Sequence, residues 1–146
     1  MPAKVIVHSL PDYAHAQLIT AAGRAFVADE PADQGGNDLG PDPYRLLLWA
    51  LGACTAMTIQ IYARRKKYPL LEVAVEVEHS RVHAEDCTDC EDQGAGRIEV
   101  FHRRIVLRGE LSVEQREDLL RVASHCPVHK TLAAAPEVID SVEVVA

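Results

Sequence analysis

The chain has 146 residues, of which 48% are hydrophobic, and this size and apolar content predict one compact domain over residues 1–146. A formal net charge of −7 gives no positive field across the surface, so we expect neither nucleic acid nor a membrane as partner. The beginning of the sequence lacks the apolar core of a secretory signal, which favours a cytoplasmic location. There, four cysteines indicate catalytic, redox or metal roles rather than structural disulfides.

Short alternating segments open the chain. They predict strands at 4–8, 15–20 and 24–29, with a turn at Ala21-Ala22-Gly23 between the last two. The following segment, 29–42, is rich in Pro, Gly, Asp and Asn and has no periodicity, so it predicts a loop.

A long helix is predicted to begin at Asp42-Pro43, because Asp can accept the free amides of a first turn and proline fits the first helical position. Tyr68-Pro69 disfavours its continuation beyond about Lys67. The apolar stretch 46–61 contains two threonines and a glutamine and, at about 16 residues, is short of the roughly 20 that span a bilayer. Because its middle is apolar on every side, one sheet face cannot cover it, and we expect a partner subunit to bury the rest.

Two long strands are predicted next, at 72–82 and 97–108. The apolar members assigned to the second strand are Ile98, Val100, Ile105 and Leu107.

The last third of the chain predicts a helix and a final strand. Ser112 with Gln115 three residues later has the pattern of a capping box, and Pro127 is expected to mark the end of this helix. The segment 138–145 is predicted to be a strand. This order of elements predicts an α+β domain with helices against a mainly antiparallel sheet.

Two cysteines lie in segments of unusual composition. Cys54 is in the middle of the long predicted helix, where a small thiol among alanines is commonly a packing residue. A glycine such as Gly52, two residues before Cys54, destabilises a helix interior by about 1 kcal/mol relative to alanine. We therefore expect a structural reason for it, such as the close approach of another group. Cys126 precedes Pro127, where a plain helix-terminating turn is the alternative to a functional thiol.

Three segments around these cysteines resemble the motifs of the OsmC/Ohr family, the osmotically inducible protein C and organic hydroperoxide resistance proteins. They are Gly40-Pro41-Asp42-Pro43-Tyr44-Arg45-Leu46-Leu47-Leu48, Ala50-Leu51-Gly52-Ala53-Cys54-Thr55-Ala56-Met57-Thr58 and His125-Cys126-Pro127-Val128-His129-Lys130-Thr131-Leu132. The similarity extends from about residue 15 to the C-terminus. It implies an α+β fold of mainly antiparallel sheets wrapped around long central helices, in an intertwined OsmC-like homodimer with paired cysteines at the interface.

The resemblance also implies a thiol-dependent peroxidase that reduces organic hydroperoxides. Cys54 would become a sulfenic acid, and Cys126 would condense with it to a disulfide. No bound cofactor is expected, and an external dithiol of the lipoyl type would restore the thiols. Leu51, Met57 and His129 are expected to contact the substrate.

A free cysteine has a pKa near 8.5, so Cys54 needs a cation or several hydrogen bonds to react as a thiolate. Family enzymes use an arginine oriented by a glutamate, but Tyr44-Arg45 occupies the place where that glutamate is expected. Arg45 falls on the opposite side of a straight helix from Cys54. Arg24 is our first candidate for the activating cation, and an ordinary surface arginine is the alternative.

A second constellation is Cys87-x-x-Cys90, with His83 four residues upstream. Together with His79 or His102 it could supply zinc ligands, although a lone Cys-x-x-Cys is weak evidence and the pair could equally be an accessory disulfide or spare thiols in a hairpin. A metal-binding or redox-sensing protein is therefore one alternative function. An OsmC-fold protein that binds an apolar small molecule without peroxide chemistry is another.

Overall fold

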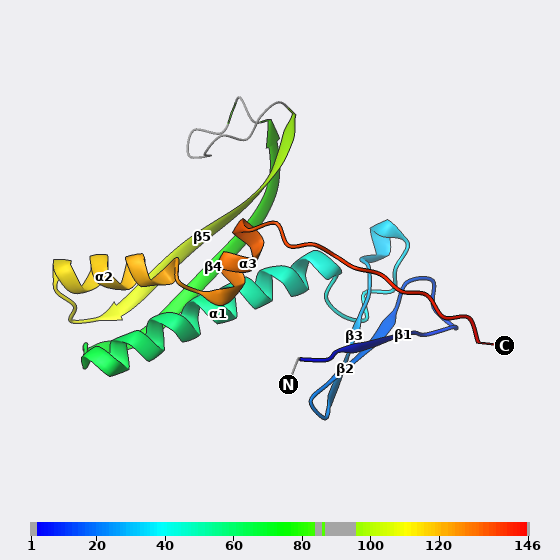
Figure 1. Cartoon of the computed structure of the whole chain (residues 1–146), viewed down its shortest axis with the longest axis horizontal. Helices are drawn as coiled ribbons and strands as arrows, with labels where there is room; N and C mark the ends of the chain where they lie inside the picture. Colours follow the sequence, from blue (N-terminus) through cyan, green and yellow to red (C-terminus); the bar gives the residue numbers. More distant parts are fainter. Residues whose placement is uncertain (1–2, 84–85, 87–95, 146) are drawn as a thin grey trace. The chain divides into compact units, whose positions relative to one another are not determined.

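The computed structural model of the chain describes residues 3–83, 86 and 96–145 (Figure 1). Within it the chain forms two compact units, Met1–Trp49 and Ala50–Ala146, which are described separately. The long helix α1 (Pro43–Lys66) begins in the first unit and runs on in the second.

The first unit contains a three-stranded antiparallel sheet in the order β1 (Ile6–Ser9), β2 (Gln17–Ala21) and β3 (Arg24–Ala28). Ala22 and Gly23 join β2 to β3 with φ angles of 49° and 74°, and two successive positive φ angles suit a tight hairpin between twisted strands. The three predicted strands and the predicted turn are confirmed, with shifts of at most two residues at the strand ends.

The predicted loop before α1 contains one short 3-10 helix, η1 (Ala32–Gln34), and is organised around the carboxylate of Asp29. This side chain is 3% exposed and accepts hydrogen bonds from the amides of Glu30, Asn37 and Leu39, at 2.8, 3.0 and 3.3 Å. Burial alone would raise the pKa of Asp29, but the three amides and the nearby His15 outweigh it and hold the pKa below its usual value.

Asp29 is therefore expected to make the stability of the fold depend on acid pH. Because its folded-state pKa is depressed, its contribution is complete above the unfolded-state pKa and is lost as the pH falls through the folded-state pKa. In urea unfolding at pH 7 and pH 3, Asp29→Asn should lose less stability on acidification than the wild type. Asp33→Asn, at an exposed position of η1, is the control, and equal acid losses in all three proteins would contradict the prediction.

Both ends of α1 agree with the sequence analysis. Asp42 Oδ1 accepts a hydrogen bond from the Arg45 amide at 2.9 Å, which caps the first turn. Lys67 follows the helix with a φ of 56°, and the amide of Tyr68 bonds back to the carbonyl of Ala63 at 2.9 Å. The helix is 24 residues long, so the predicted boundaries were accurate to one residue.

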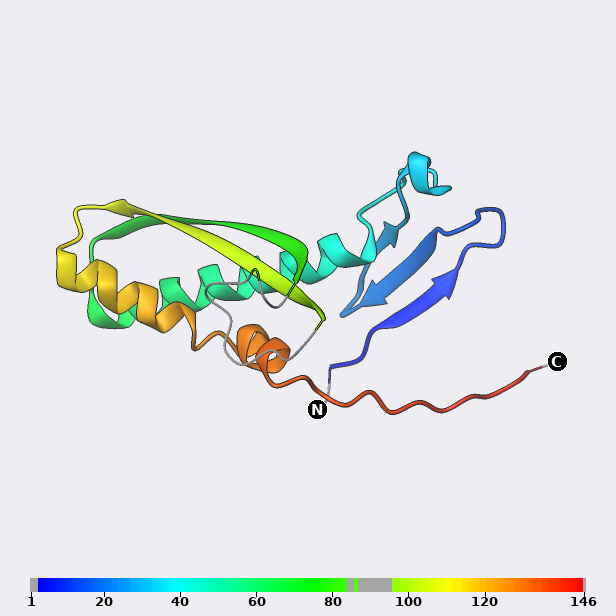
Figure 2. The ribbon, with the colours of Figure 1, turned by 90° about the horizontal axis from the view of Figure 1, so that it is seen from above.

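The second unit packs α1 along one face of an antiparallel ribbon formed by β4 (Leu70–His83) and β5 (Arg97–Gly109), with α2 (Val113–Ala123) beside it (Figure 2). The buried residues of α1 recur at every fourth position: Leu51, Thr55, Ile59 and Ala63. The buried core cluster consists of Ile59, Ala63, Leu111, Leu119 and Ala123. Val73, Ile105 and Leu107 of the ribbon pack against this cluster, so α1, α2 and the ribbon share one core.

Polar contacts fix α2 against the carboxyl end of α1. The predicted capping box is present, with reciprocal bonds between Ser112 and Gln115. The hydroxyls of Tyr62 and Tyr68 both donate to Asp118 Oδ2, at 2.8 and 2.7 Å. The orientation of α2 also positions Cys126, because the chain runs from the end of α2 directly to this cysteine.

The structure corrects two predictions for the end of the chain. Pro127 does not follow the last helix but begins a further one, α3 (Pro127–Ala133), since proline is as suitable at a first helical position as after a helix end. The predicted strand at 138–145 is not formed in the described part of the chain. Its apolar side chains, such as Ile139 and Val142, are both 90% exposed, and without a neighbouring strand the alternating pattern has nothing to pair with.

One side of α1 is left open to solvent. Met57 and Ile61, four residues apart, are 59% and 57% exposed. By length and composition alone α1 also meets the requirement for a membrane span, contrary to the expectation that its apolar stretch is too short. A single such helix is weak evidence, because core helices of soluble proteins have the same properties, and α1 buries a full stripe against protein.

Candidate active site

Cys54 and Cys126 come together between α1 and the start of α3, and both are free thiols with their side chains in hydrogen-bonding contact. The close approach inferred from Gly52 is present, because a Cβ at this position would lie 3.3 Å from Cγ2 of Val77. Glycine thus lets α1 pack tightly on β4 two residues before the cysteine.

Cys126 is fully buried and occupies the N-cap position of α3. Its sulfur accepts a hydrogen bond from the amide of His129, with an N to S distance of 3.5 Å, and further bonds from the Val128 amide, the Thr55 hydroxyl and the Cys54 thiol. Burial acts to raise the pKa of Cys126, but these donors outweigh it and lower the pKa below that of an ordinary thiol.

The pKa of Cys54 is shifted in the opposite direction, above that of an ordinary thiol. Burial raises the pKa of its thiol, and donation of its proton to the Cys126 sulfur raises the pKa further, while bonds from the Val128 amide and the Thr58 hydroxyl only partly offset this. These opposite directions favour the first negative charge on the buried Cys126 sulfur and the proton on the more accessible Cys54.

Arg103, on β5, is a cation that the sequence analysis did not single out and that contacts residues around the cysteine pair. Its Nη1 donates to Thr55 Oγ1 at 2.9 Å and to the Ala123 carbonyl at 3.2 Å, and its Nη2 donates to His129 Nδ1 at 2.7 Å. Strand parity was the available signal: residues 103, 105 and 107 share one face of β5, and Ile105 and Leu107 belong to the core. All four apolar residues assigned to this strand belong to β5, with Ile98 and Val100 on the face opposite to Ile105 and Leu107.

The contact with Arg103 determines the protonation state of His129. A guanidinium has no acceptor, so His129 Nδ1 must be the acceptor and the ring is neutral with its proton on Nε2. Burial lowers the pKa of His129, and the positive charge of Arg103 lowers it further.

The other predicted site residues are more dispersed. Arg24 is exposed at the start of β3 in the first unit and stays a prediction as the activating cation. Arg45 forms an ion pair with Asp42 of the helix cap at 3.3 Å. Leu51 is 3% exposed on the core side of α1, whereas Met57 lies on its open side, so these two expected substrate contacts diverge.

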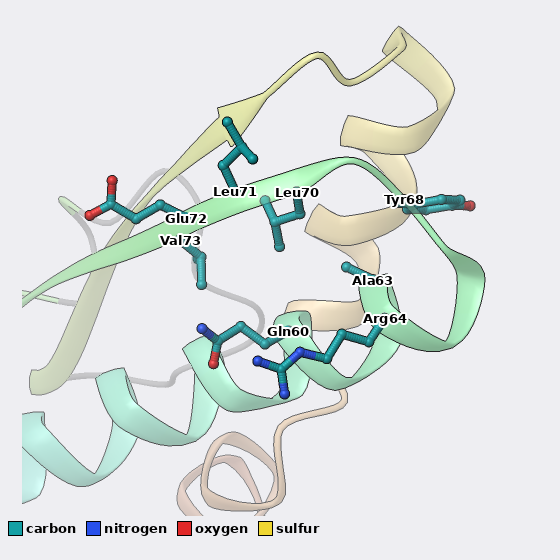
Figure 3. Close-up of a pocket in the computed structure, with 8 residues that line it drawn as sticks. All are labelled: Gln60, Ala63, Arg64, Tyr68, Leu70, Leu71, Glu72 and Val73. Atoms are coloured by element: carbon teal, nitrogen blue, oxygen red, sulfur yellow. The ribbon is translucent and has the colours of Figure 1, made fainter.

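Described residues of the second unit line a larger and a smaller cavity. One, of about 460 Å³, is lined by Thr58, whose hydroxyl bonds to Cys54, and by Pro127, which follows Cys126, while neither cysteine itself is among its lining residues. Ile61 and Val122 give it apolar walls, and the rest of the lining is polar or basic: Tyr62, Arg65, Arg121 and His125. The other cavity, of about 80 Å³, lies between the end of α1 and the start of β4, away from both sulfurs (Figure 3).

The predicted zinc or accessory thiol site at Cys87 and Cys90 falls outside the described residues. His83, its third proposed ligand, ends β4 and is exposed. Residues 3–83, 86 and 96–145 contain no cluster of three His, Cys, Asp or Glu side chains able to hold a metal ion.

Several proteins of known structure are similar in fold to this chain. A search of curated proteins found no match. The chain is similar to a solved OsmC-like protein from Mycoplasma pneumoniae, with 19% identity, a TM-score of 0.70, and coverage of 91% of this chain and 88% of that chain. It is also similar to a proposed osmotic stress induced and detoxification response protein from Psychrobacter arcticus, at 23% identity and TM-score 0.65, covering 90% of this chain and 87% of that chain.

A third similar structure is an organic hydroperoxide resistance protein from Legionella pneumophila, with 18% identity, a TM-score of 0.60, and coverage of 90% of this chain and 89% of that chain. At these identities the three structures establish the α+β fold with antiparallel sheets. The family described as OsmC-like protein matches residues 35–139, a range that includes both Cys54 and Cys126. The chain belongs to the OsmC-like protein family.

Proposed function

We propose that the chain is a thiol-dependent peroxidase that reduces organic hydroperoxides. The observation that carries the proposal is the contact between the Cys54 thiol and the Cys126 sulfur, because two thiols in contact can both open a peroxide and close to a disulfide. Family membership and hydroperoxide-resistance relatives of the same fold support a redox or peroxide-resistance role.

In the first step the Cys54 sulfur attacks one peroxide oxygen. An S–O bond forms as the O–O bond breaks, the electron pair leaves on the alkoxide, and the alkoxide takes a proton to give an alcohol. Cys54 is the attacking sulfur because it is partly accessible, whereas Cys126 is 0% exposed. Since the resting proton is on Cys54, it moves along the hydrogen bond to Cys126 as the peroxide is attacked.

In the second step Cys126 closes the disulfide. Its proton is released, its sulfur attacks the Cys54 sulfenic acid, an S–S bond forms, and hydroxide leaves to become water. The amides of Val128 and His129 favour the thiolate needed for this attack. An external dithiol, which we expect to be of the lipoyl type in the cytoplasm, then reduces the disulfide by two electrons.

The substrate is proposed to enter through the 460 Å³ cavity. Its walls of Ile61, Val122 and Pro127 suit the apolar part of an organic hydroperoxide, while Thr58 lies next to the reacting sulfur. Leu51, Met57 and His129 stay predictions as substrate contacts, since none of them lines this cavity.

Peroxide-dependent oxidation of dihydrolipoamide by the purified full chain tests the proposal. Turnover with cumene hydroperoxide or a fatty-acid hydroperoxide is expected. Absence of turnover with cumene, tert-butyl and fatty-acid hydroperoxides would reject the proposed activity.

We also propose that the active protein is a homodimer. The exposed residues Met57 and Ile61 form an apolar side of α1 that no described part of the chain covers. In size-exclusion chromatography the wild type should elute as a dimer and Ile61→Glu as a monomer, because a charge would be buried in the interface. Gln60→Glu, at an exposed polar position beside it, should remain dimeric, and a monomeric wild type would contradict the proposal.

A second candidate function is binding of an apolar small molecule without peroxide chemistry. The volume of the cavity, about 460 Å³, is in the range of small-molecule sites and favours it. The two candidates differ in one result: a binding protein should retain its ligand in Cys54→Ser and consume no dithiol in any form.

A further inference from the structure

We propose that Arg103 is a positioning residue of the cysteine pair. It holds the pair in its reactive arrangement by anchoring Thr55 and His129, whose hydroxyl and backbone amide contact the Cys126 sulfur. The guanidinium of Arg103 bonds to three helices that meet at the cysteine pair: to α1, to the end of α2 and to α3. Its role in turnover rests on the proposed peroxidase function, whereas its effect on the thiols does not.

The first step of the argument concerns Thr55. Its hydroxyl has a single proton, and Arg103 Nη1 occupies a lone pair of the oxygen at 2.9 Å. The proton is therefore directed away from Arg103, either to the Leu51 carbonyl at 2.7 Å or to the Cys126 sulfur. Without Arg103 this fully buried hydroxyl would lose the donor that orients it.

The second step concerns the start of α3. Arg103 bonds to the His129 ring at 2.7 Å, and the amide of the same residue donates to the Cys126 sulfur at 3.5 Å. The bond from Arg103 to the Ala123 carbonyl at 3.2 Å holds the other side of the Cys126 turn. The guanidinium thus fixes the backbone both before and after the cysteine.

The third step is electrostatic. The hydroxyl, carbonyl and imidazole that Arg103 contacts are all neutral, so none of these three bonds neutralises its positive charge. A nearby positive charge in a partly buried site favours an anion, and the cysteine pair supplies one. Lysine cannot reproduce these contacts. The two terminal nitrogens of the planar guanidinium donate to three acceptors, whereas lysine has a single ammonium nitrogen.

The test measures the rate of iodoacetamide alkylation against pH without any peroxide. All proteins carry Cys87→Ser and Cys90→Ser, so that only the pair reacts. Arg103→Met is expected to move the midpoint of the first ionisation upward by about one pH unit or more, because hydrogen bonds to charged groups are strong. Arg103→Lys should give an intermediate midpoint.

Arg104→Met is the matched control. Arg104 is the next residue of β5, on the outer face, where it pairs with Glu76 at 2.9 Å and its side chain is 69% exposed. Its alkylation profile should equal that of the wild type. A folded Arg103→Met with the wild-type profile would overturn the proposal, and if Arg103→Met fails to fold, a wild-type profile for Arg103→Lys would overturn it instead.

The two proposals fail separately in this design. If the wild type reduces no peroxide while Arg103→Met still shifts the alkylation midpoint, the peroxidase proposal fails and the positioning role of Arg103 holds. If the wild type turns over and Arg103→Met has unchanged alkylation and unchanged kcat, the positioning role fails and the peroxidase proposal holds.

Discussion

Replacement of Cys54 by serine should lower peroxide-dependent oxidation of dihydrolipoamide by roughly 10³-fold or more, because a serine hydroxyl is a far weaker nucleophile than a thiolate at neutral pH. Cys126→Ser should behave differently. Its Cys54 can still open one peroxide, so a dimedone-reactive sulfenic acid should accumulate to one per chain, while turnover through the internal disulfide is lost.

The contrast between the two variants is the measurement that assigns the roles of the sulfurs. Intact mass after one equivalent of cumene hydroperoxide should show a dimedone adduct in Cys126→Ser and none in Cys54→Ser. Cys87→Ser should retain the wild-type rate. The reverse pattern of adducts would mean that the buried sulfur is the attacking one.

Replacement of Leu119 by alanine is expected to lower the free energy of unfolding by about 2–5 kcal/mol. Leu119 is 0% exposed in the core cluster that joins α2 to α1, so the smaller side chain leaves a cavity in a close-packed site. Urea unfolding followed by far-UV circular dichroism measures the change.

The neighbouring residue provides the control for this prediction. Leu120 is 62% exposed on the same helix, and Leu120→Ala should change stability by less than about 0.5 kcal/mol. Equal losses in the two variants would show that α2 does not hold the core together. Because α2 leads directly to Cys126, Leu119→Ala should also weaken the contact between the sulfurs.

Local signals were sufficient to predict most helix and strand boundaries. Asp42-Pro43 defined the start of α1, and Ser112 with Gln115 defined the start of α2, because both act on amides within one turn. Such short-range chemistry does not depend on the rest of the fold. The contact between Cys54 and Cys126 was predicted for another reason, the resemblance of their motifs to those of a family.

Long-range contacts account for what the sequence did not reveal. Proline is compatible with a helix start as well as a helix end, so Pro127 alone could not distinguish α3 from a turn. Arg103 was missed because its partners lie on α1, α2 and α3, and only the strand register places it on their side of β5. The alternation in 138–145 was misleading because a strand requires a neighbour as well as a pattern.

The N-cap of α3 is a cysteine whose sulfur also belongs to the proposed reacting pair. The acceptor for the His129 amide is the Cys126 sulfur itself, rather than a serine or aspartate oxygen. A thiolate is a strong acceptor and a disulfide sulfur a poor one, so in the proposed cycle each closing of the disulfide would remove the cap from the helix. The first turn of α3 would then be held more tightly in the reduced protein than in the oxidised one.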